Sequence, residues 1–113
     1  MLHRDRLILK KMLVVCEYVA EFVHGFTLES FMKDEKTKNA VAMTLVRIGE
    51  LSSKFSDDFR KVNIGIPHRE IRGMRNAVAH GYDVLRFDEI WYTATVDIPE
   101  LKVKIEKHLS KPA

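Results

Sequence analysis

Residues 8–26, "ILKKMLVVCEYVAEFVHGF", carry the hydrophobic pattern that decides the fold class. Apolar side chains recur there in alternating steps of four and three, at Ile8, Met12, Val15, Val19, Phe22 and Phe26. This spacing is typical of one face of an α-helix, in which 3.6 residues complete each turn. The stretch therefore predicts a long first helix with Gly25 near its end.

Similar signals predict two helices in the next part of the chain. Thr27 can cap a short helix that extends to Met32. A second long helix is expected from about Glu35 to Phe59, because its apolar residues again follow a helical period. Gly49 inside it costs about 1 kcal/mol relative to alanine, and a close helix crossing is the usual compensation.

The second half of the chain predicts two more helical stretches. Pro67 suits the first turn of a third main helix, which should end at residue 79 or 80, before the stop signal of Gly81. The last stretch starts near Phe87 and contains Pro99, which either kinks it or divides it into two shorter helices. We expect an all-α bundle of four main helices with an additional short helix.

Composition fits one small folded domain. The chain has 113 residues, 46% hydrophobic and 31% charged, a balance that distinguishes it from disordered chains. We therefore expect residues 1–113 to form a single domain. The 19 Lys and Arg exceed the 16 Asp and Glu by only three, so any site for a polyanion must be local.

Cysteine usage and hydropathy limit where the protein works. Cys16 is the only cysteine, which excludes an internal disulfide and a thiolate zinc cluster. The histidines show no metal-ligand spacing, and no apolar run approaches the roughly 20 residues of a membrane span. The charged start of the chain does not resemble a signal peptide. We expect a soluble, cytoplasmic protein without a metal or cofactor.

Residues 73–82, "GMRNAVAHGY", hold the candidate reactive side chains. Arg75 and His80 are five residues apart, and Tyr82 follows just beyond the expected helix. Five residues correspond to 500° of rotation, so on an ideal helix Arg75 and His80 point about 140° apart. A site that uses both needs the helix to end at His80, a long reach by Arg75, or a second subunit.

The third main helix is predicted to have one buried and one polar face. Its buried stripe should contain Ile71, Met74 and Val78. The opposite arc collects Arg69, Arg72, Gly73, Asn76 and His80. Glycine leaves a notch in this arc, which would let another backbone or a ligand come close.

These residues also have ordinary structural explanations. His80 could interact only with the negative end of the helix dipole, for about 0.3 to 1 kcal/mol. The arginines could form a solvated face, Tyr82 could be a packed aromatic, and Glu50 could be an exposed helix carboxylate. The bare Arg-to-His spacing is a weak signal, which Asn76 and Tyr82 make more specific.

The run "MRNAVAHGY", with "RIGEL" upstream and "FDEIWYTATVDIPELKVKI" downstream, resembles the HepT proteins of the HEPN superfamily. These are the toxin halves of prokaryotic MNT/HepT toxin-antitoxin pairs. The likeness covers most of the chain, and its most specific part is the Arg-x4-His-x-Tyr motif of Arg75, His80 and Tyr82. One departure is His68, which follows Pro67 where relatives often have tryptophan.

The resemblance implies an all-helical homodimer in which two copies of the motif face each other in a cleft. It implies a metal-independent endoribonuclease with Arg75 and His80 as catalytic residues, and Asn76 and Arg72 as supporting polar residues. It further implies that an MNT-type nucleotidyltransferase antitoxin adenylylates the hydroxyl group of Tyr82. RNA, this antitoxin and a second copy of the chain are thus the expected partners.

The chemistry of the motif suits RNA cleavage without metal. A histidine with a pKa near 6.5 can act as base or acid, and arginine offers bidentate donors to phosphate. DNA lacks the attacking 2′-hydroxyl and should not be cut. Two alternatives stay open: a non-catalytic HEPN module that binds nucleotide or RNA, and an adaptor that docks the nucleotidyltransferase. An adaptor, however, has no need of a histidine near a phosphate-binding cation.

Overall fold

The computed structural model describes residues 1–81 and 85–112, with only the backbone described at Val78. All regular structure in these residues is helical, which confirms the predicted fold class. The elements are α1 (His3–Val23), α2 (Leu28–Lys33), α3 (Glu35–Ser52), α4 (Asp57–Arg60), α5 (His68–His80), α6 (Phe87–Tyr92), the π-helix η2 (Thr93–Asp97) and α7 (Ile98–Leu109). None of the described helices combines the length and hydropathy of a membrane span.

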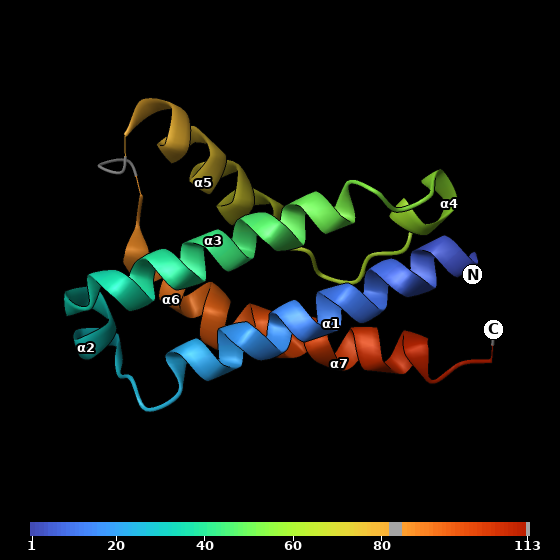
Figure 1. The fold of residues 1–113 in the computed structure, drawn as a ribbon, viewed down its shortest axis with the longest axis horizontal. Coiled ribbons are helices and arrows are strands. Elements are labelled where there is room, and N and C mark those ends of the chain that lie inside the picture. Colours follow the sequence, from blue (N-terminus) through green and yellow to red (C-terminus); the bar gives the residue numbers. More distant parts are fainter. Residues whose placement is uncertain (82–84, 113) are drawn as a thin grey trace.

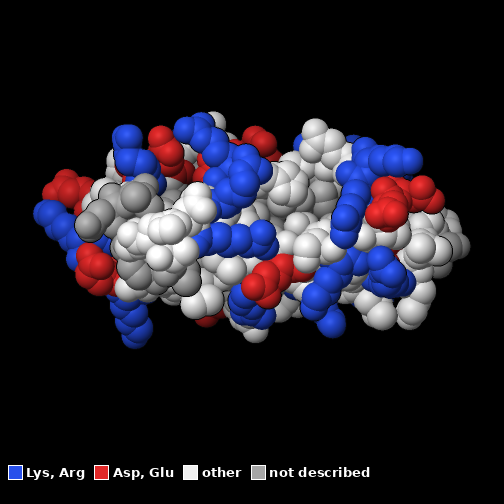
Figure 2. Space-filling view, turned by 90° about the horizontal axis from the view of Figure 1, so that it is seen from above, with Lys and Arg blue, Asp and Glu red and all other residues white. Residues whose placement is uncertain are grey.

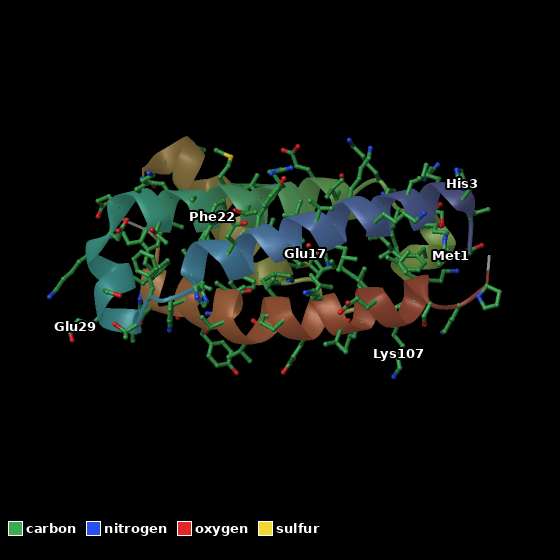
Figure 3. All side chains as sticks on the ribbon, turned by 60° about the horizontal axis from the view of Figure 1, so that its bottom comes forward. Met1, His3, Glu17, Phe22, Glu29 and Lys107 are labelled. Carbon is green, nitrogen blue, oxygen red and sulfur yellow. The ribbon has the colours of Figure 1, made fainter. Side chains whose placement is uncertain are left out.

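Three long helical stretches form the body of the molecule. Figure 1 shows α1 beside α3 on one side and beside α7 on the other, and Figure 3 shows the same order from another direction. The side chains between these helices form the core together with Phe31 of α2, and those without solvent exposure include Leu9, Met12, Val19, Val41, Leu45, Ile48, Leu101 and Ile105. In contrast, α5 lies across the other side of α3, outside this body (Figure 1).

The connection between α1 and α2 follows the expected capping rules, although α1 ends earlier than predicted. α1 ends at Val23, so Phe26 lies beyond it, while Gly25 occupies the turn with a φ of +82°. Thr27 begins α2 with a capping box. Its hydroxyl accepts a hydrogen bond from the Ser30 amide (3.1 Å), and the Ser30 hydroxyl accepts one from the Thr27 amide (2.9 Å). The predicted cap is confirmed.

The prediction that the second long helix reaches Phe59 was wrong, because α3 ends at Ser52. The break is fixed by Asp5, a buried carboxylate that accepts hydrogen bonds from the amide and hydroxyl of Ser56 at 2.8 and 2.6 Å. Ser56 in turn caps the separate helix α4, which Phe59 belongs to. A tertiary contact across 51 residues therefore overrides the local helical period.

The predicted interruption near Pro99 takes the form of a wide helical turn. No loop separates α6 from α7, because η2 continues the helical path between them. At its end the Ile98 amide donates to the carbonyl of Thr93, five residues earlier. Such π turns lie within longer helices, and here Ile98 is the last residue before Pro99, which cannot donate a hydrogen bond.

Candidate active site

The packing of α5 on α3 positions the candidate residues. Ile71, Met74 and Ala77 form its buried stripe, which confirms the first two of the predicted stripe residues, while the side chain of Val78 lies outside the described part. α5 ends where predicted: Gly81 has a φ of +105°, in the region that favours glycine, and its amide donates to the Ala77 carbonyl at 2.8 Å. Most of the other described side chains of α5 are exposed.

Gly49 makes the close crossing of α3 and α5 possible. A Cβ atom at this position would lie 2.5 Å from Cγ2 of Ile71, closer than packed atoms allow. It would also lie 3.4 Å from Nη2 of Arg75. The glycine therefore fulfils the predicted role of a close helix crossing, and it lets the guanidinium group of Arg75 lie directly over α3.

The structure does not bring Arg75 and His80 together within one chain. Both side chains are exposed, and α5 continues as a regular helix through His80. The separation of about 140° between their directions therefore holds. Arg75 points to the α3 side, whereas His80 shares the other side with Asn76, four residues earlier, which is also exposed.

Arg75 borders a hollow of about 400 Å³ between the end of α3, α4 and α5. Its cationic lining consists of Arg60, Arg72 and Arg75, with His68 beside them, and its apolar lining includes Phe55, Phe59, Ile64 and Ile71. None of the described residues that line it is an aspartate or glutamate. Figure 2 looks down on this side of the molecule and shows Lys and Arg on both sides of an uncharged area. The hollow is suited to an anion with an apolar part.

Sequence reasoning treated His68 as a surface residue and did not consider Arg60. His68 is exposed, but with Arg72 and Arg75 it follows steps of four and three, so the three residues share one face of α5. That spacing could have revealed the set. No sequence signal could have added Arg60, because its position depends on the break between α3 and α4.

The residues of the "RIGEL" segment face two different sides of α3. Gly49 faces α5, whereas Glu50 and Arg47 border a groove next to α1, together with Lys11 and Lys54. Glu50 is exposed, as expected of a helix carboxylate, and lies outside the hollow beside Arg75. Tyr82, the remaining predicted site residue, lies outside the described residues.

The described residues contain neither a metal-binding cluster nor a reactive thiol. Across residues 1–81 and 85–112, no group of three His, Cys, Asp or Glu side chains could hold a metal ion. Cys16 is buried in the core, and burial raises the pKa of its thiol to about 12. A thiol that stays protonated is a poor nucleophile, so Cys16 has a packing role.

The sequence of this helical bundle matches a known protein family. The family described as Ribonuclease HepT-like matches residues 12–108. The chain therefore belongs to the HepT-like ribonucleases, within the HEPN group that the motif resembles, and its enzyme class is endoribonuclease.

Similar proteins come from bacteria and archaea. A protein of Thermococcus cleftensis named "Probable ribonuclease HepT" is 38% identical over 91 residues, which are 80% of this chain and 83% of that protein. A candidate RNase of Caldanaerobacter subterraneus subsp. tengcongensis is 34% identical over 103 residues, or 91% and 92% of the two chains. One from Methanocaldococcus jannaschii is 34% identical over 89 residues, or 79% and 74%. No solved structure is significantly similar.

Proposed function

We propose that this protein is a toxin that cleaves RNA without metal, through Arg75 and His80 of two subunits. The observation that carries the proposal is the exposure of both side chains on α5, in a chain that belongs to a ribonuclease family. An arginine and a histidine on the solvated side of a helix can reach a polymer that is too large to enter a closed pocket. RNA is such a substrate.

A homodimer would complete the site. Within one chain, Arg75 and His80 point to different sides of α5, so a single copy presents an incomplete set of groups to one phosphate. A two-fold axis beside α5 would bring His80 of one subunit near Arg75 of its partner. The same axis would supply two histidines, one for each proton transfer.

The reaction then needs only groups that the chain contains. One His80 takes the proton from the 2′-hydroxyl, whose oxygen attacks the adjacent phosphorus. The other His80 donates a proton to the departing 5′-oxygen, so the products are a 2′,3′-cyclic phosphate and a 5′-hydroxyl. Arg75 offers two parallel N–H donors to the phosphate oxygens, whose charge increases in the transition state. Asn76 and Arg72 support the substrate from neighbouring positions.

Metal-free cleavage of RNA is the direct test. Purified protein should cut mixed single-stranded RNA in the presence of EDTA, should leave 2′,3′-cyclic ends, and should not cut DNA of the same sequence. Sedimentation should give about twice the 13.1 kDa mass of the chain. A requirement for Mg²⁺ would contradict the mechanism, and activity in a strictly monomeric protein would contradict the shared site.

Control by an antitoxin completes the proposal. An MNT-type nucleotidyltransferase would transfer an adenylyl group from ATP to the Tyr82 hydroxyl, with release of pyrophosphate. Tyr82 is two residues from His80, so the added phosphate and nucleotide would compete with RNA for the nearby cations. Mass spectrometry after co-expression should find adenylyl groups on the peptide that contains Tyr82, and Tyr82→Phe should escape this silencing. A neutralised toxin with unmodified Tyr82 would show that docking alone inhibits.

The lining of the hollow supports a second candidate, a non-catalytic HEPN module that binds nucleotide or RNA through its arginines. It predicts binding without cleavage under every condition, which the same RNA assay distinguishes. For either function we propose a single domain over residues 1–113 that works in the cytoplasm, where RNA and ATP are available.

A further inference from the structure

The hollow between α3, α4 and α5 has the chemical character of a nucleotide site. Its volume of about 400 Å³ lies within the range of pockets that hold small ligands. Buried apolar side chains form one part of its lining, with Phe55, Phe59 and Ile64 each less than a tenth exposed. Cationic side chains form the other part. A ligand that satisfies both parts carries a flat or apolar group and an anionic group on the same small molecule or residue.

The cations of the hollow differ in how they are held. Arg60 is fixed, because its Nε donates to the carbonyl of Phe55 at 3.1 Å and its Nη2 donates to that of Ser53. Arg72 and Arg75 have neither a hydrogen bond nor a carboxylate partner among the described residues. Their guanidinium groups are therefore available to an external anion, and phosphate is the anion whose geometry matches them.

The position of Arg75 connects the hollow to the reaction. Arg72 and Arg75 are one helical turn apart on the same face of α5, about 4.5 Å along its axis. A chain whose scissile phosphate is bound by Arg75 can thus direct a neighbouring nucleotide toward Arg72 and the apolar lining. His80 points to the other side of α5, so the hollow lies apart from the proton-transfer groups of its own subunit.

We propose that this hollow binds one nucleotide of single-stranded RNA, the one next to the scissile phosphate. The base contacts Phe55, Phe59 and Ile64, and its phosphate binds Arg72. This inference rests on the proposed ribonuclease function, and it adds a site that positions the substrate strand. Single-stranded RNA fits better than a duplex, because only an unpaired base can leave its stack and enter a hollow.

A filled hollow tests the inference without removing a charge. Val62 borders the hollow and is 40% exposed, so Val62→Trp should occupy the space while the fold is retained. Val103 is 63% exposed on α7, outside the hollow, and Val103→Trp is its matched control. The probe is a short single-stranded 2′-deoxy oligonucleotide, which cannot be cleaved, titrated at low salt by fluorescence anisotropy. Thermal unfolding checks that both variants are folded.

We expect Val62→Trp to weaken binding of this probe about tenfold, the scale of losing the contacts of one base, and Val103→Trp to leave it unchanged. Arg72→Ala should weaken it similarly, and Lys36→Ala, which removes a charge at the distant start of α3, should have little effect. Equal binding by Val62→Trp and Val103→Trp would overturn the inference. Binding of AMP as tight as that of the oligonucleotide would also overturn it, in favour of a free-nucleotide site.

The same variants separate this inference from the proposed function. If the protein does not cleave RNA but Val62→Trp still loses probe binding, the nucleotide site stands and the catalytic proposal fails. If Val62→Trp cleaves RNA as fast as Val103→Trp at limiting substrate, the catalytic proposal stands and the nucleotide site fails.

Discussion

α1 and α5 are both amphipathic helices, but they contribute differently to the molecule. α1 packs against α3 and α7, and its buried residues extend from Asp5 to Val19. α5 packs mainly against α3 and buries one narrow stripe. The sequence of α1 is therefore constrained by packing on two sides, while most of α5 is free to carry reactive groups. The helix that determines the fold and the helix that carries the candidate site are separate elements.

The largest effect should come from a change on α5 that leaves packing alone. His80→Ala should lower RNA cleavage about 100- to 10,000-fold, the usual contribution of a general acid or base. The fold should survive because His80 is exposed. His24→Ala, an exposed histidine beyond the end of α1, is the control and should keep full activity. Rates of cleavage in EDTA measure both, and undiminished activity in His80→Ala would exclude its catalytic role.

A smaller effect should follow from weakening the contact between α5 and α3. Gly49→Ala places a methyl group 2.5 Å from Cγ2 of Ile71, and overpacking of this kind costs about 1–3 kcal/mol. Because the clash concerns only the α3–α5 crossing, hydrogen exchange should rise in α5 before it rises in α1. RNA cleavage should fall as well, since Arg75 lies beside the same glycine. Unchanged hydrogen exchange in α5 would show that the α3–α5 crossing accommodates the added methyl group without loss of stability.

An alanine at Gly73, unlike one at Gly49, should raise the stability of the protein. Among the described residues, nothing lies within 4 Å of a Cβ atom added to Gly73, which is half-buried inside α5 and borders a hollow beside α6. Gly73→Ala should therefore stabilise the protein by about 0.5–1 kcal/mol through helix propensity alone. Denaturant unfolding compares it with Gly49→Ala. A loss of stability in a dimer but not in a monomer would reveal that the notch at Gly73 is covered by the partner subunit.

The contrast between the two helices also explains what the sequence could predict. The spacing of apolar residues gave α1 and the position of α5, because amphipathic periods are local information. It failed at Phe59, where the contact between Asp5 and Ser56 ends α3 early. Arg75, Asn76 and His80 could be assigned to one helix because they lie on consecutive turns of it, and their role in a site stays a prediction. The hollow could not be predicted from the sequence, because Arg60 borders it only where the chain breaks between α3 and α4.

The smallest predicted effect concerns the charges that face α5 from the body of the molecule. Asp97 in η2 has a pKa above its usual value, because partial burial disfavours its carboxylate and because Glu70 of α5 and Glu100 are nearby. A carboxyl group whose pKa is higher in the folded than in the unfolded state favours folding below about pH 4, where it is protonated in both states. This stability is lost as the pH rises through the folded-state value. At neutral pH the ionised carboxylate therefore costs stability, through its partial burial first and through its repulsion by Glu70 and Glu100 second.

Asp97→Asn should remove this repulsion and stabilise the protein at pH 7 by about 0.5 kcal/mol or less, the usual scale of single charge changes near the surface. The gain should shrink toward pH 4, where the carboxyl group of the unchanged protein is increasingly protonated. Glu106→Gln, an exposed acid on α7 that does not shift the pKa of Asp97, is the matched control. Thermal unfolding at both pH values measures the difference. Equal gains for the two variants would mean that only the net charge matters here. A gain specific to Asp97→Asn, with slower hydrogen exchange in α5, would assign the repulsion to Glu70.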